Sequence, residues 1–285
     1  MSTIPIRGIQ PTLSGAELKG GFSLRRLSGL LEGTDMVQEI HRHDFFFILV
    51  IEEGTGNHEI DFSPYPVTKD CVFFMRPGQV HKLTLHAGCT GYLLQFSSEF
   101  FYPKDRMSRQ LLYQASGHCQ LEGKETKRLV SLLKQIFEEQ KSRSEGYLEM
   151  IKANLNILFI ELVRNWKRNK NPVPHTAPHS QEQLQRLHDL VEAHLRELKQ
   201  VSQYAEMMNL SIYQVNAITK ETLGKTCSEF INDLIVLESK RHLLVTSNQV
   251  KEIAFQLGYE DVSYFSRFFK KHTGYSPEAF RNACS

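Results

Sequence analysis

The last third of the chain contains one sequence pattern twice, and this repetition limits the possible fold more than any other feature. Residues 211–224 read SIYQVNAITKETLG and residues 261–274 read DVSYFSRFFKKHTG, so corresponding positions lie fifty residues apart. Each copy begins with a residue that can cap a helix, carries apolar residues at helical spacing and ends in glycine. The pattern predicts two equivalent amphipathic helices, the second over Val262–Thr273.

A short helix is predicted before each of the repeated helices. The segments VSQYAEMM and VKEIAFQL each contain an alanine, Ala205 and Ala254, where a neighbouring helix can approach closely. A short helix, a tight turn containing Gly258 and an amphipathic second helix together describe a helix-turn-helix unit. Residues 228–246, between the two units, favour one longer helix. We therefore expect an all-α domain with two helix-turn-helix units over residues 181–285.

The outward faces of the repeated helices carry hydroxyl, amide and cationic groups. Arginine can donate two hydrogen bonds to guanine, and lysine neutralises phosphate charge. Two such helices joined by a longer one could enter successive major grooves, which repeat about every 34–36 Å along one face of B-DNA. The residues expected to contact DNA are Tyr213, Asn216, Lys220, Ser263, Ser266, Arg267, Lys270 and Lys271. An alternative is a protein-interaction adaptor that never touches DNA, but the clustered cations argue against it.

The second copy and its flanks resemble a known family. The stretch IAFQLGYEDVSYFSRFFKKHTGYSPEAFR is similar to the signature of the DNA-binding domain of AraC-type transcription regulators. The resemblance implies double-stranded DNA as a partner and leaves RNA polymerase open as a second one. The first copy departs from the family at Ala217, often an arginine, and at Thr219, often a phenylalanine. The resemblance therefore assigns base reading more firmly to the second copy.

Residues 20–97 have the pattern of short strands separated by turns. The strand-like runs are 45–51, 59–62, Cys71–Met75, 82–85 and 92–96, and Ser63–Pro64 is among the turn signals between them. Strands at this spacing predict a barrel or sandwich. The features HRHDFFFILVIEEGTG and VFFMRPGQVH resemble the cupin-like sensory domain of AraC-type regulators. The resemblance implies a cupin-like β-barrel within residues 1–100, which senses a small-molecule effector.

Three histidines in this region form an enzyme-like constellation. His41 and His43 lie two positions apart in a strand-like stretch, so they share a face, and His81 follows a turn. The set resembles the metal motif of cupins, in which a glutamate stands four positions after the second histidine. Here that position is Phe47, which cannot ligate a metal. We expect no metal and no cofactor, and interpret His41, His43, Phe47 and His81 as an effector pocket or as structural groups; the alternative function is a metal-dependent cupin enzyme with a helical appendage.

Two amphipathic helices are predicted between residues 126 and 166. The apolar stripe of the second helix is wide and includes Leu155, Phe159 and Leu162. A wide stripe can serve a partner subunit, so we expect residues 101–166 to be a helical region that forms a homodimer. The alternative is that both stripes pack on the barrel. Residues 167–180, KRNKNPVPHTAPHS, lack apolar periodicity and read as an interdomain linker.

Composition limits the remaining function classes. The net charge of +2 does not indicate a polyanion partner, so positive potential for DNA would be local. The five cysteines form no CxxC pair, which favours reduced, buried side chains. Neither a signal peptide nor a bilayer-spanning apolar run is recognisable. We expect a cytoplasmic, non-enzymatic transcription regulator of the α+β multidomain class, with no membrane partner.

Overall fold

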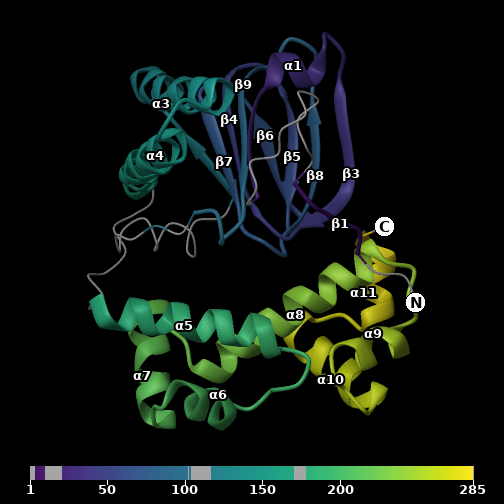
Figure 1. Ribbon diagram of the computed structural model, residues 1–285. Helices are drawn as coiled ribbons and strands as arrows, with labels where there is room; N and C mark the ends of the chain where they lie inside the picture. The colour runs from purple at the N-terminus through teal and green to yellow at the C-terminus, as the bar shows by residue number, and fades with distance from the viewer. Residues whose placement is uncertain (1–3, 10–20, 102, 104–116, 170–177, 285) are drawn as a thin grey trace. The chain divides into compact units, whose positions relative to one another are not determined.

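The chain folds into two compact units, one within residues 5–172 and the other within residues 173–285. The computed structural model describes residues 4–9, 21–101, 103, 117–169 and 178–284 (Figure 1). The first unit is β-rich with two long helices, and the second is helical. The α+β multidomain class predicted from the sequence is confirmed.

The β-rich unit consists of two five-stranded sheets. The first sheet has the order β1 (Ile6–Arg7), β3 (Met36–His43), β8 (Val80–Leu85), β5 (Gly56–Ile60), β6 (Ser63–Val67). The second has the order β10 (Gly117–Gln120), β7 (Cys71–Met75), β4 (Phe46–Glu53), β9 (Thr90–Phe96), β2 (Phe22–Arg26). All pairings are antiparallel except β1 with β3. Among the described residues the two sheets share no strand, so the expected barrel takes the form of a double-sheet sandwich, as in jelly rolls.

The second sheet is buried on both faces. Phe47, Leu49 and Ile51 of β4 belong to the hydrophobic cluster between the sheets, whereas Ile48 and Val50 belong to the cluster on the opposite face. A strand covered on both sides reads as a continuous apolar run rather than an alternating one. This explains the sequence FFILVI in β4.

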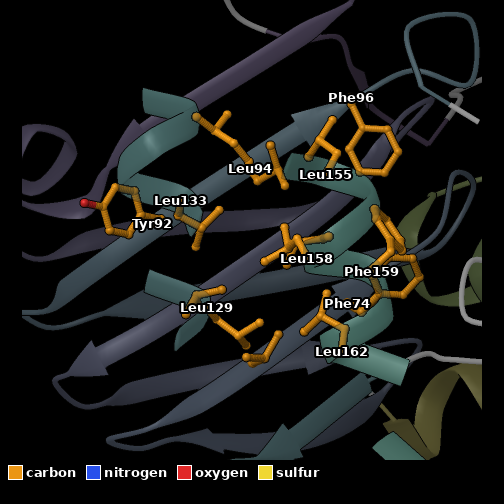
Figure 2. Packing of buried hydrophobic residues seen from close by; sticks show 14 of the residues in the cluster. Phe74, Tyr92, Leu94, Phe96, Leu129, Leu133, Leu155, Leu158, Phe159 and Leu162 are labelled. Atoms are coloured by element: carbon orange, nitrogen blue, oxygen red, sulfur yellow. The ribbon is translucent and has the colours of Figure 1, made fainter. Parts of the chain in front are cut away.

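Two helices cover the outer face of this sheet, α3 (Gly123–Ser142) and α4 (Tyr147–Asn169). Figure 2 shows their leucines packed against aromatic residues of β7 and β9. The stripe residues Leu155, Phe159 and Leu162 are all at most 1% exposed within this single chain. Their interpretation as a subunit interface is therefore wrong, because the sheet of the same chain already covers them. A dimer would need a different surface.

Strands β5 and β6 differ from the predicted strand pattern because of contacts with residues distant in sequence. Strand β5 begins at Gly56, three residues before the predicted start, because Gly56 pairs with Val67 of β6 and Leu85 of β8. A Cβ at Gly56 would lie 2.1 Å from the Thr84 oxygen of β8. The glycine thus marks a close backbone approach inside a strand. Ser63–Pro64, predicted as a turn, begins strand β6. Strand β6 lies at a sheet edge, where proline is tolerated.

The region between the sheets and the second unit also differs from expectation. Residues 101–166 are not helical throughout, because β10 pairs with β7 of the second sheet. Helix α4 continues to Asn169 and α5 (Pro178–His194) begins two residues before the end of the predicted linker 167–180. Residues 170–177 of that linker lie outside the described residues. A short helix of the β-rich unit is α1 (Leu27–Leu31).

The C-terminal unit contains the two predicted helix-turn-helix units. The first is α6 (Val201–Met208) with α7 (Ile212–Leu223), and the second is α9 (Val250–Gln256) with α10 (Val262–Thr273). Helix α8 (Cys227–Val245) contacts both helix-turn-helix units, and α11 (Pro277–Cys284) packs on α8 and α10. One hydrophobic cluster runs through all of them. It includes Ala205 and Ala254, as the close approach of helices requires.

The packing of α4 on the sheet predicts a large stability loss for Phe159→Ala. The ring is fully buried and contacts Phe74, Phe96 and Phe101, so its removal should lower the free energy of unfolding of this unit by about 3–5 kcal/mol. Trp166, the single tryptophan, lies in the same cluster, so its fluorescence during urea titration reports this transition.

The control is Phe255→Ala, which removes a phenylalanine that is 46% exposed in the other unit. It should leave the tryptophan transition within about 0.5 kcal/mol of the parent protein. Equal transitions for both variants would contradict the described packing.

Candidate nucleic-acid interface and histidine cluster

Helix α10 begins and ends where the sequence predicts. The side chain of Asp261 accepts a hydrogen bond from the Ser263 backbone N–H at 2.7 Å, and Gly274 adopts φ 83° at the C-cap. Phe265 and Phe269 are fully buried on one side of the helix. The helix is thus held by its aromatic face, which leaves the opposite face available.

The exposed face of α10 carries the predicted cations. Ser263, Arg267, Lys270 and Lys271 are all exposed, while Ser266 is half-buried. Three positive side chains within five residues give a local positive potential, although the chain as a whole is nearly neutral.

Helix α7 presents a less charged face. Its N-cap Ser211 accepts from the Gln214 backbone N–H, and Gly224 occupies the C-cap at φ 72°. Tyr213 is 82% exposed, and Lys220 is exposed as well. An aromatic hydroxyl and one lysine can contact phosphate or base edges, but no arginine stands on this helix.

Asn216 behaves differently from the other predicted DNA contacts. Its amide nitrogen donates to the Ile212 carbonyl at 3.0 Å, and its amide oxygen accepts from the Cys227 backbone N–H at 3.0 Å. The side chain is half-buried and ties α7 to the first residue of α8. The structure therefore gives Asn216 a role inside the protein.

The turns of the two units share one conformation. Asn209 and Gly258 both have positive φ, 55° and 77°. In each unit the next residue donates its N–H to the alanine carbonyl of the short helix at 2.9 Å, Leu210 to Ala205 and Tyr259 to Ala254. A Cβ at position 258 would lie 1.7 Å from the Arg196 carbonyl oxygen. The second turn thus requires glycine on two grounds.

Four buried histidines meet between the two sheets of the β-rich unit. His41 and His43 of β3 lie on one face, as predicted, and His81 of β8 lies against both. His58 of β5 completes the cluster and was missed, because it lies between the predicted strand runs 45–51 and 59–62. The alternation in GNHEI, with His58 and Ile60 both buried, is the signal that could have found it.

The ring nitrogens of this cluster contact one another directly. Nε2 of His81 lies 2.8 Å from Nε2 of His43 and 3.1 Å from Nε2 of His41. Nδ1 of His81 lies 2.8 Å from Nε2 of His58. Phe47 stacks beside His43 with ring centroids 5.6 Å apart, and it lies 5.3 Å from His81. The four predicted pocket residues are therefore brought together, and His58 joins them.

Burial keeps these imidazoles neutral. Desolvation, followed by repulsion from His41, lowers the pKa of His43 to about 4. Desolvation with repulsion from His43 and His41 lowers the pKa of His58 to about 3. The pKa values of His41 and His81 are lowered as well, mainly by desolvation. At neutral pH the cluster is an uncharged set of nitrogen donors and acceptors.

Matches to two family models cover most of the chain. Residues 30–153 match the AraC-like ligand binding domain, and residues 204–283 match a helix-turn-helix domain. The chain is an AraC-type transcription regulator.

Similar proteins include a transcriptional activator and two proteins of solved structure. The HTH-type transcriptional activator RhaS of Escherichia fergusonii is 25% identical over 243 residues, which span 85% of this regulator and 86% of RhaS. Fatty-acid-bound ToxT of Vibrio cholerae is 16% identical, with a TM-score of 0.41 over 93% of this chain and 96% of that one. An AraC-type regulator from Chromobacterium violaceum is 23% identical, with a TM-score of 0.35 over 38% of this chain and 97% of that one.

Two further findings bear on the regulator's class. Within the described part of the chain, no helix combines the length and apolarity needed to cross a membrane. Cys71, Cys89, Cys119 and Cys227 are free and buried, as the sequence predicts for cysteines without a paired motif.

The contacts of Asn216 predict that Asn216→Ala destabilises the junction of α7 and α8 by about 1–2 kcal/mol, because the Cys227 N–H loses its acceptor. Amide hydrogen exchange in the first turn of α8 should accelerate roughly 5- to 30-fold. Ser266→Ala, at the equivalent position of the second unit, is the control. There the residue corresponding to Cys227 is Pro277, which has no N–H to satisfy. Unchanged exchange in Asn216→Ala would show that the hydrogen bond contributes nothing.

Proposed function

We propose that this regulator binds one face of double-stranded DNA through α7 and α10, under control of an effector sensed by the β-rich unit. The observation that carries the proposal is the exposed cationic face of α10, opposite the fully buried Phe265 and Phe269, on a helix-turn-helix unit that occurs twice around α8. A helix fixed on its apolar side and open on its polar side suits insertion into a major groove.

Helices α7 and α10 are the proposed recognition helices, and their residues take different roles. Arg267 reads a base, because its guanidinium can donate two hydrogen bonds to guanine. Lys270 and Lys271 neutralise phosphates, and Ser263 contacts phosphate or a base edge. In the first helix-turn-helix unit, Tyr213 and Lys220 contact the duplex, and Asn216 supports them from within the fold.

The β-rich unit is the proposed sensor. The match to the AraC-like ligand binding domain supports this assignment, and His41, His43, Phe47 and His81 are the proposed effector site. An effector controls DNA binding by population shift, which requires that it bind the DNA-competent arrangement more tightly than the other.

A regulator of this kind acts in the cytoplasm, on DNA and through RNA polymerase, and has no catalytic role; the similarity to the transcriptional activator RhaS supports this part of the proposal.

The assignment of Arg267 predicts a sequence-specific defect. Arg267→Ala should cost about 1–3 kcal/mol on the preferred duplex and relax the preference at one base pair. Lys270→Ala should weaken binding to all sequences alike and reduce the salt slope of the logarithm of the affinity by about one.

Selection of bound sequences from random duplex DNA, followed by salt titration, measures both effects. Lys251→Ala is the control, because this lysine is an exposed cation on α9 and not on a recognition helix. If Arg267→Ala keeps the full sequence preference of the parent protein, base reading by this residue is excluded.

A homodimer remains part of the proposal, with a different surface from the one first expected. Met150 and Ile157 on α4 are 50% and 46% exposed, and Ala153 between them is exposed. The spacing i, i+3, i+7 places these three residues on one side of the helix, away from the sheet. An exposed apolar stripe beside the buried one suits a second copy of the same helix. Dimerisation would join two DNA-binding domains and raise the affinity for a tandem site by roughly 10²–10⁴.

The double variant Met150→Glu, Ile157→Glu tests this surface. It should sediment as a folded monomer and bind a tandem DNA site far more weakly, while its affinity for one half-site stays unchanged. Val37→Glu is the control, because Val37 is also an exposed apolar residue, 58% exposed, but lies on β3. Sedimentation velocity and gel-shift titration give the two readouts. A double variant with the parent's mass and tandem affinity would rule out this interface.

A further inference from the structure

Three imidazole nitrogens of the β-rich unit converge on one point. Nε2 of His81 faces Nε2 of His43 at 2.8 Å and Nε2 of His41 at 3.1 Å, and the ligand atoms of the three residues all lie within 4.8 Å of one another. A tetrahedral zinc ion with Zn–N distances of about 2.0–2.1 Å holds its nitrogen ligands ~3.3 Å apart. The three nitrogens thus need only small rotations to surround one ion.

The opposite ring nitrogens fix which atoms carry protons. Nδ1 of His41 lies 2.6 Å from the Glu39 carbonyl oxygen, and Nδ1 of His43 lies 3.3 Å from the Arg7 carbonyl oxygen. A carbonyl oxygen only accepts, so each Nδ1 must be the donor. In a neutral ring the Nε2 atom is then unprotonated. The Nε2 lone pairs of His41 and His43 therefore both point at Nε2 of His81. Without a cation, the single proton on Nε2 of His81 must be shared between these two acceptors.

The backbone contacts also match the arrangement found around bound metals. A histidine that ligates a metal typically donates its other N–H to a carbonyl, a carboxylate or a water, and this partner orients the ring. His41 and His43 each have such a carbonyl. The other nitrogen of His81 contacts His58, whose Nδ1 has no hydrogen-bond partner among the described residues. His58 is thus placed to orient His81.

We propose that His41, His43 and His81 bind one divalent transition-metal ion of the zinc class through Nε2, with His58 as the positioning residue for His81. Three imidazoles without a carboxylate favour Zn²⁺ or a similar borderline ion over Mg²⁺ or Ca²⁺. This reverses the expectation drawn from Phe47. That expectation considered one missing ligand, whereas the structure shows the ring of Phe47 as a wall beside three converged donors.

The inference rests on the proposed sensory function, because it names the ligand of the site that we propose for the effector. The two can fail separately. Metal binding is measured on the free protein, and metal-dependent control is measured as a change in DNA affinity between metal-free and metal-loaded protein. Stoichiometric binding with unchanged DNA affinity would support the metal site and overturn its sensory role.

The experiment is titration of the chelator-treated full chain with Co²⁺ and then with Zn²⁺. We expect about one Co²⁺ per chain, with the intense visible absorption of a four- or five-coordinate ion, and displacement of Co²⁺ by one equivalent of Zn²⁺. Zn²⁺ should also raise the thermal midpoint of the parent protein, because it binds only the folded state. No bound Co²⁺ at micromolar concentrations would overturn the proposal without any variant.

Variants separate this site from adventitious binding. His41→Gln, His43→Gln and His81→Gln should each lose binding by more than 100-fold, beyond the roughly 10- to 100-fold typical of outer partners. His58→Leu should weaken binding by about 10- to 100-fold and shift the Co²⁺ spectrum, and His58→Gln, which can still hydrogen-bond His81, should restore both. His118→Leu is the control, because His118 also contacts Phe73 in this unit but lies outside the cluster. Binding that survives the three glutamine variants, or falls equally in His118→Leu, would identify an adventitious ion only.

Discussion

The β-rich unit depends on burying one sheet on both of its faces. Strands β4, β7 and β9 supply apolar residues to the cluster between the sheets and to the cluster beneath α3 and α4. Burial at roughly 25 cal/mol per Å² on two faces stabilises these strands far more than a half-exposed sheet could. The first sheet then needs fewer apolar contacts of its own. It can carry polar side chains inward, and the four histidines lie on that sheet.

The two helix-turn-helix units solve one structural problem in two ways. A helix follows each recognition helix, α7 or α10. At the first residue of that following helix, a backbone N–H must either find an acceptor or be missing altogether. In the first unit that residue is Cys227, and the side chain of Asn216 accepts from it. In the second unit the residue is Pro277, which has no N–H, and Ser266 stands where Asn216 stood. The second unit therefore releases that side chain from a structural duty and keeps its polar face, with Arg267, for contacts outside the protein.

Sequence reasoning succeeded where the determining interactions are local. Helix α10 was predicted residue for residue, because Asp261 and Gly274 mark its ends and a stripe of phenylalanines marks its buried side. The faces of His41 and His43 followed from strand alternation alone. Such features need only a few neighbouring residues to decide them.

The failures share a different cause, namely partners distant in sequence. An apolar stripe shows that a helix is covered but not by what, so Leu155 and Phe159 were assigned to a second subunit when the sheet covers them. Strand β5 starts at Gly56 only because β8 pairs with it there, and the predicted run, which began at residue 59, left His58 out of the site.

The close backbone approach at Gly258 has a consequence for how the family can diverge. Its partner is the backbone carbonyl of residue 196, which every amino acid carries, so no substitution at 196 can make room for a larger residue at 258. Position 258 is thus constrained without a covarying partner, and methods that detect contacts through paired substitutions are blind to this contact between residues 196 and 258.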